Sequence, residues 1–146
     1  MRAIWISVLF PALAVLGNAN VGYSQGLELG KFEYLNSCAS CHGLTGKGDG
    51  PVAKSLKRNP ADLTKLSEAN KGIFPFSRIY DVIDGRFEVV THGKREMPVW
   101  GQVYQPTGGS AETPAIPPHL SKALGELFVR GRILALIEYI STLQGK

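Results

Sequence analysis

The stretch "SCASCHGLTGKGDG", residues 37–50, decides how this chain is interpreted. Its two cysteines, Cys38 and Cys41, are separated by two residues, and His42 follows directly. They are the only cysteines in the sequence, so they cannot join distant segments by disulfides as the cysteines of small exported domains do. The pattern leaves three chemistries to weigh: a redox dithiol, a zinc site and covalent attachment of a haem.

Two of these chemistries fit the surrounding sequence poorly. A redox dithiol needs a βαβ context, whereas a predicted helix precedes this motif and a glycine-rich loop follows it. A structural zinc site needs four ligands, and the other histidines, His92 and His119, form no second close pair. C-x-x-C-H is the attachment signature of c-type haem, in which the thiols add to two vinyl groups and the histidine binds the iron. We therefore predict one covalently bound haem c.

The N-terminus has the pattern of an export signal. The uncharged apolar stretch "AIWISVLFPALAVL", residues 3–16, follows Arg2 and precedes small polar residues. Its 14 residues are fewer than the about 20 that a membrane-spanning helix needs. We predict that residues 1–25 are a signal peptide, that residues 26–146 form one domain, and that the domain is exported to the periplasm. A retained N-terminal anchor is the alternative.

The second axial position of the iron requires another ligand, for which methionine and histidine are the usual candidates. Met1 belongs to the predicted signal peptide, which leaves Met97, 55 residues after His42. Pro98 biases Met97 toward an extended conformation, which suits a loop that presents a thioether. We predict Met97 as the ligand; the alternatives are a packing role for Met97 and ligation by His92. We expect His119 to be a solvated loop residue.

These residues resemble the class I c-type cytochromes, which are small monohaem electron carriers. The resemblance rests on "CASCHGLTGKGDGP" and the later "EMPVWG", and it extends from about residue 30 to 144. It implies an all-α cytochrome c fold. In that fold the N- and C-terminal helices cross, and short helices and loops wrap around one covalently bound haem.

The same resemblance assigns roles to individual residues. Cys38 and Cys41 would form the thioethers, and His42 and Met97 would bind the iron. Pro51 stands where the family places a proline whose carbonyl accepts a hydrogen bond from the proximal imidazole, which would orient the ring and tune its donor strength.

A close crossing of the terminal helices is also implied by the resemblance. Gly30 and Tyr34 match a glycine and an aromatic residue of the first helix, and Leu136 and Tyr139 match the partner face of the last. Gly131 either accommodates Gly30 or marks a bend in the last helix.

Helix signals place the remaining elements. Apolar spacing predicts the last helix over residues 121–144, with Ser121 as N-cap, and a short helix over 76–85, with Ser77 as N-cap and Gly85 as stop. We expect a loop with a turn of helix over 48–64 and irregular structure over the proline-rich residues 102–119. For residues 87–93 we favour helix, with a strand of four residues as the alternative.

The haem propionates would need donors. The candidates are Arg58, Arg78, Arg86, Arg95 and Trp100. We favour Arg95 and Trp100, because both flank the predicted ligand loop.

Iron with two protein ligands has no open position for a substrate, so we predict an electron carrier that works by outer-sphere transfer and not an enzyme. Without Arg2, 15 basic residues face 12 acidic ones, and no run of like charge favours nucleic acid as a partner. We expect a monomer that meets redox proteins transiently and meets membranes only through a redox complex or an uncleaved N-terminus. One alternative is an electron-transfer subunit of a larger dehydrogenase, oxidase or reductase complex. Another is a ligand-binding haem sensor in which Met97 dissociates.

Overall fold

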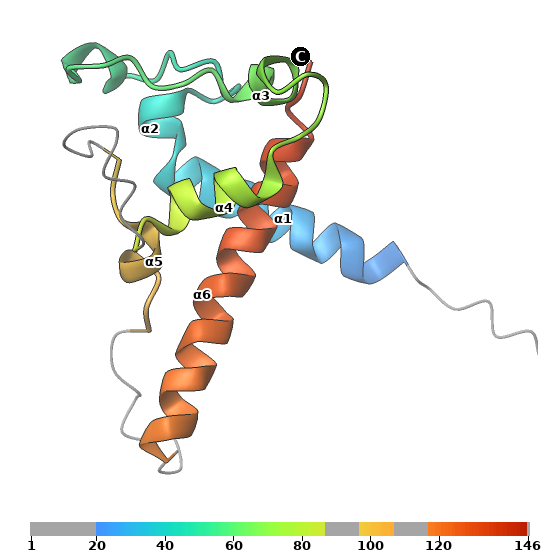
Figure 1. Ribbon diagram of the computed structural model, residues 1–146, viewed down its shortest axis with the longest axis vertical. Coiled ribbons are helices and arrows are strands. Elements are labelled where there is room, and N and C mark those ends of the chain that lie inside the picture. Colours follow the sequence, from blue (N-terminus) through green and yellow to red (C-terminus); the bar gives the residue numbers. More distant parts are fainter. Residues whose placement is uncertain (1–19, 87–96, 107–116, 146) are drawn as a thin grey trace, which may run out of the picture.

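The computed structural model describes residues 20–86, 97–106 and 117–145 (Figure 1). Within these ranges the regular elements are all helical, so the all-α prediction is confirmed. In chain order they are α1 (Asn20–Ser37), α2 (Ala39–His42), the 3-10 helices η1 (Ala53–Ser55) and η2 (Leu63–Lys65), α3 (Leu66–Ala69), α4 (Phe76–Asp84), α5 (Trp100–Val103) and α6 (Pro118–Ser141).

The first and last helices cross closely, and α1 and α4 both lie beside α6 (Figure 1). A Cβ on Gly30 would lie 2.6 Å from the carbonyl carbon of Ala135 and 3.0 Å from Cβ of Tyr139. The rings of Tyr34 and Tyr139 also meet, with centroids 5.2 Å apart. The predicted crossing is therefore confirmed. Gly131 takes no part in it, because a Cβ there would have no neighbour within 4 Å.

A partly buried ion pair reinforces this crossing. The carboxylate of Glu33 in α1 is 3% exposed and accepts hydrogen bonds of 2.8 and 2.7 Å from Arg132 in α6. The guanidinium of Arg132 also lies 4.0 Å from the ring centroid of Tyr104, directly after α5. Burying a charge is costly unless it is paired, so the bidentate geometry is what makes this position tolerable.

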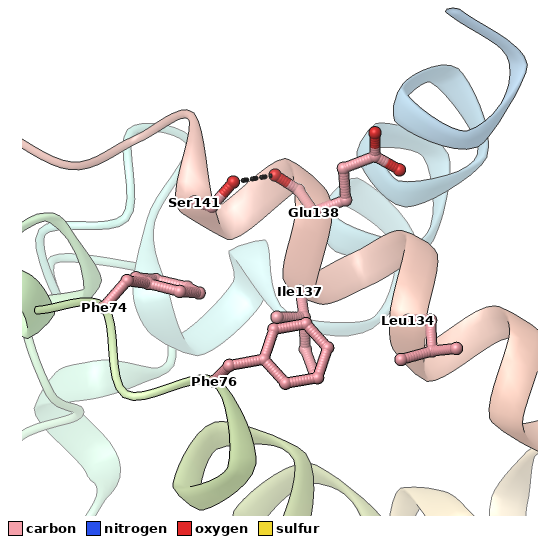
Figure 2. Close-up of a pocket in the computed structure, with 6 residues that line it drawn as sticks. All are labelled: Phe74, Phe76, Leu134, Ile137, Glu138 and Ser141. Atoms are coloured by element: carbon pink, nitrogen blue, oxygen red, sulfur yellow. Dashed lines mark hydrogen bonds between the residues drawn. The ribbon is translucent and has the colours of Figure 1, made fainter. Parts of the chain in front are cut away.

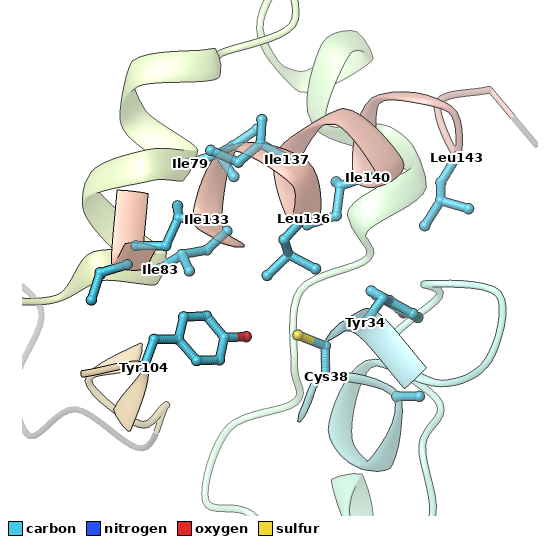
Figure 3. Packing of buried hydrophobic residues seen from close by; sticks show 12 residues of the cluster. Tyr34, Cys38, Ile79, Ile83, Tyr104, Ile133, Leu136, Ile137, Ile140 and Leu143 are labelled. Carbon is cyan, nitrogen blue, oxygen red and sulfur yellow. The ribbon is translucent and has the colours of Figure 1, made fainter. Parts of the chain in front are cut away.

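The core lies between these helices, with side chains from α1, α4 and α6 around Tyr104 and Cys38 (Figure 3). Its buried members are Tyr34, Cys38, Ala39, Ile79, Ile83, Tyr104, Val129, Ile133, Leu136, Ile137, Ile140 and Leu143. Met97 and Trp100 are partly buried and pack against this cluster. The first cysteine of the motif and the predicted ligand loop therefore share one core.

Two predicted helix starts are wrong. α6 begins at Pro118, with Pro117 at the cap position, so Ser121 lies inside the helix. α4 begins at Phe76, with Pro75 at the cap position, so Ser77 is not an N-cap either. In both cases a proline fixes the backbone just before the helix and sets the start earlier.

Other boundaries agree in part with the sequence. Gly85 ends α4 as predicted, with a φ of 64°. The stretch 102–119, expected to be irregular, contributes two residues to α5 and two to α6. The predicted helix over 87–93 lies outside the described residues. α1 begins at Asn20, and no helix in the described part of the chain is long and apolar enough to cross a membrane.

Candidate functional site

The two cysteines of the motif lie one helical turn apart. Cys38 is the residue before α2 and is buried, whereas Cys41 is partly exposed. The carbonyl oxygen of Cys38 accepts a hydrogen bond of 2.8 Å from the backbone N–H of His42. Both are free thiols. Burial, aided by Glu33 and Cys41, raises the pKa of Cys38 to about 12. A thiol that stays protonated is a poor redox nucleophile, so this environment disfavours dithiol exchange.

The geometry of His42 is suited to binding a metal through one nitrogen. Its Nδ1 lies 2.9 Å from the carbonyl oxygen of Ala61. A carbonyl only accepts, so Nδ1 donates the proton and Nε2 keeps a lone pair for iron. Burial lowers the pKa of His42, and the Ala61 hydrogen bond opposes this only in part. The ring is therefore held as the neutral tautomer that a haem iron requires.

Ala61, and not Pro51, supplies the carbonyl that orients His42, so the role predicted for Pro51 is wrong. Gly50 donates its N–H to the carbonyl of Cys41 at 3.1 Å, and Val52 donates to Ser40 at 3.0 Å. These bonds hold residues 50–52 along α2 and leave the proline ring exposed.

The glycine-rich loop still shapes the histidine site, by a different route from the one predicted. Gly48 has a φ of 79°, and a Cβ there would collide with the carbonyl oxygen of Pro60. The absent side chain lets the 59–62 segment approach the loop, and the N–H of Leu63 donates to Gly46 at 2.7 Å. This approach brings the carbonyl of Ala61 to His42.

Tyr34 has a second role that the sequence did not reveal. Besides packing on Tyr139, it donates its hydroxyl to the carbonyl of Gly43 at 2.6 Å in a buried hydrogen bond. Gly43 is the residue after His42, so the helix crossing and the histidine are tied together by one side chain. In the sequence, the spacing of Tyr34 from Cys38 predicted only that Tyr34 packs in the helix crossing.

Met97 begins the described segment that leads into α5. It is partly buried and packs against the core cluster that contains Cys38 and Tyr104. This placement is compatible with a ligand role, which stays a prediction. His92 lies outside the described residues, and of His119 only the backbone is described, at the start of α6.

Nε1 of Trp100, three residues after Met97, is buried and forms no hydrogen bond within the described part of the chain. The ring of Tyr104 lies 5.5 Å from the ring of Trp100, between centroids, and in Figure 3 its hydroxyl points toward the sulfur of Cys38. A buried donor without a partner is rare, and a bound group with an acceptor oxygen would satisfy it. The residues present therefore fit a haem beside Cys38.

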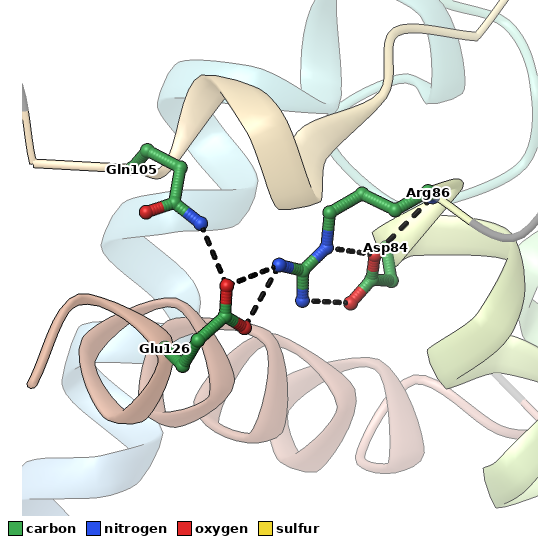
Figure 4. Close-up of polar contacts among 4 residues, drawn as sticks. All are labelled: Asp84, Arg86, Gln105 and Glu126. Atoms are coloured by element: carbon green, nitrogen blue, oxygen red, sulfur yellow. Dashed lines mark hydrogen bonds and ion pairs between the residues drawn. The ribbon is translucent and has the colours of Figure 1, made fainter. Parts of the chain in front are cut away.

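The other predicted propionate donors are placed less favourably. Arg86 is fully engaged by Asp84 and Glu126, so the structure corrects its candidacy (Figure 4). Arg95 lies outside the described residues. Arg58 and Arg78 have exposed side chains. Trp100 is thus the donor that the described residues favour.

A separate hollow lies between the chain before α4 and the C-terminal part of α6 (Figure 2). Its lining is mainly apolar and consists of Phe74, Phe76, Leu134, Ile137, Glu138 and Ser141. None of these residues belongs to the attachment motif. Among the described residues, no group of three His, Cys, Asp or Glu side chains could hold a metal ion.

The family model described as cytochrome c oxidase, cbb3-type, subunit III matches residues 26–108, more than half of the 146-residue chain. The chain belongs to this c-type cytochrome family. No curated protein and no solved structure matches the chain. Membership in the family implies a covalently bound haem c and haem-based electron transfer, as the attachment motif predicted.

Proposed function

We propose that this cytochrome is a periplasmic carrier of single electrons in which His42 and Met97 bind the haem iron. The observation that carries the proposal is the hydrogen bond from His42 to Ala61, which leaves Nε2 available beside two free thiols. The bound haem supplies an iron that accepts and releases one electron. The protein's own contribution is to hold the ligands, exclude water and present an edge to partners.

The proposed ligands would define the type of reaction. If His42 and Met97 both held the iron, no position would remain for oxygen, peroxide or another substrate. A thioether favours the ferrous state relative to a second imidazole and so raises the potential. Buried aliphatic side chains such as Ile83, Ile133 and Leu136, which share a core with Cys38, would act in the same direction, because a dry surrounding disfavours extra positive charge.

The surface around α2 suits a brief contact with a redox partner. Leu35, Leu44 and Val52 expose apolar side chains there, and Leu44 is 73% exposed. The side chains of Lys47 and Lys54 are exposed in the same part of the chain. A small apolar patch with cationic neighbours favours steered, transient association over a permanent interface. Electrons would leave across this surface, close to Cys41.

Carbon monoxide tests the closed site. The ferrous protein, at neutral pH, should bind carbon monoxide slowly and weakly, because Met97 must leave first. A matched Met97→Ala variant should bind it readily. Fast, tight binding by the wild type would instead support the ligand-binding sensor and contradict the carrier.

A second candidate function is an electron-transfer subunit of an oxidase complex. Two observations favour it: the printed description of the matching family, and an exposed apolar stripe on α6. The stripe consists of Leu120, Leu124, Leu127 and Phe128, and Leu127 is 64% exposed. Contiguous apolar surface of this kind marks interaction sites.

Native purification in mild detergent separates the two functions. A carrier should elute alone and accept electrons from several donors, whereas constant co-purification with a catalytic subunit would favour the complex. Leu127→Gln should release such a complex, and Leu44→Gln, the matched change beside α2, should slow electron exchange without releasing it. Fractionation and N-terminal sequencing test the export proposal, which requires periplasmic protein that lacks residues 1–25.

A further inference from the structure

Four polar side chains from three parts of the fold form a cluster beside α5, here called the Arg86 cluster (Figure 4). Arg86 donates from Nε to Asp84 at 2.6 Å and from Nη2 to the other Asp84 oxygen at 2.8 Å. Its Nη1 donates to both oxygens of Glu126, at 2.7 and 2.8 Å. Gln105 completes the cluster by donating to Glu126 at 3.1 Å. One guanidinium therefore joins the end of α4 to α6 and to the segment after α5.

The position of α5 depends on this cluster. α5 has four residues, so its own hydrogen bonds cannot fix it in place. Gly101, inside α5, lies directly against the ion pair: a Cβ there would be 2.6 Å from Nε of Arg86 and closer still to Asp84. Gln105, just after α5, is bound to Glu126. α5 therefore packs against the cluster at Gly101, and the segment just after it is hydrogen-bonded to the cluster through Gln105.

Met97 lies three residues before α5 and four before Gly101. A neutral thioether is a weak ligand, so small changes in its position decide whether it stays on iron. We propose that the Arg86 cluster positions Met97 at the iron by holding α5; this inference rests on the proposed ligation of iron by Met97. Asp84, Arg86 and Glu126 are positioning residues in this sense. They do not bind the iron themselves and act on Met97 only through the backbone of α5.

The chemistry of the cluster suits a positioning role. Asp84 is 1% exposed, and its buried carboxylate is compensated by the paired Arg86. Two bidentate contacts fix the plane of the guanidinium as well as its place, which a lysine could not do. The side chain of Glu126 is 44% exposed, so a substitution there does not place an uncompensated group in the core.

The test measures how readily an external ligand displaces Met97 from ferric iron. The purified haem-loaded protein is titrated with imidazole at fixed pH and ionic strength, and the weak red charge-transfer band of methionine-ligated ferric haem is followed. Gly101→Ala forces α5 away from the ion pair, and Glu126→Gln removes one charge of the cluster. Both variants should bind imidazole about tenfold more tightly than the wild type, the loss expected when support for a metal ligand is removed.

Matched controls separate positioning from the added bulk and the lost charge. Gly131→Ala adds the same methyl group at an open position of α6. Glu138→Gln makes the same change of charge on α6, outside the Arg86 cluster. Both controls should bind imidazole as the wild type does.

The outcomes are distinct. Wild-type imidazole affinity in Glu126→Gln would overturn the proposal, even if Gly101→Ala failed to fold. An equal rise in affinity in Glu138→Gln would also overturn it, because the effect would then follow the loss of any carboxylate on α6 and not of this cluster. Absence of the charge-transfer band from the wild type would contradict Met97 ligation itself, which is a separate failure.

Discussion

Gly30→Ala is the sharpest test of the helix crossing that the site depends on. The new Cβ would lie 2.6 Å from the carbonyl carbon of Ala135 and 3.0 Å from Cβ of Tyr139, where favourable carbon contacts need about 3.5–4.0 Å. Ala135 presents backbone there, which cannot rotate away, so α1 and α6 must separate. Overpacking of this kind costs about 1–3 kcal/mol, and we take the upper value because backbone is involved. The better helix propensity of alanine returns about 1 kcal/mol. We expect a net loss of about 2 kcal/mol.

Guanidinium unfolding of the haem-loaded protein, followed by far-ultraviolet circular dichroism, measures this loss. Gly131→Ala is the control, because its Cβ meets no atom within 4 Å, and it should stabilise the protein by up to about 1 kcal/mol. The two substitutions should therefore have opposite signs. Equal stabilisation by both would refute the close crossing at Gly30.

Three further predictions concern the histidine site and the ion pairs. Gly48→Ala, at a φ of 79° and against the carbonyl of Pro60, should displace the Ala61 carbonyl from His42, weaken the donation of the imidazole to ferric iron and raise the reduction potential in a redox titration; an unchanged potential would contradict the role of Ala61. Tyr34→Phe removes the buried bond to Gly43 and should lower the free energy of unfolding by about 1 kcal/mol, so a neutral result would show that the bond adds nothing. The hydrogen bonds from Arg86 lower the pKa of Glu126 below its ordinary 4.5, so Glu126 stabilises the folded protein at neutral pH and this stabilisation is lost as the pH falls below about 4.5. The difference in denaturation midpoint between the wild type and Glu126→Gln should therefore shrink over that range, and a difference that does not change with pH would contradict this.

The sequence predicted those features that depend on local spacing. Gly30 and Tyr34 are four residues apart on one helix face, and their partners share a face of α6, so the resemblance to the family could assign the crossing to these residues. Cys38, Cys41 and His42 lie within five consecutive residues, and their mutual geometry is set by a single turn.

Features that depend on the path of a loop were not predictable in the same way. The partner of His42 is a backbone carbonyl, which carries no residue-specific signal, and the loop that delivers it turns at glycines with positive φ. The carbonyl that contacts His42 is therefore that of Ala61 and not that of Pro51. The sequence predicted Arg86 as a propionate donor, because its ion pair with Glu126, 40 residues away, follows from no local pattern.

The absorption spectrum of the ferric protein in the red tests the central claim, ligation of the haem iron by His42 and Met97. The wild type should show the weak charge-transfer band of a methionine-bound ferric haem, and Met97→Ala should lack it while keeping the haem covalently attached at Cys38 and Cys41. A band of unchanged intensity in Met97→Ala would show that another residue binds the iron and would contradict the account.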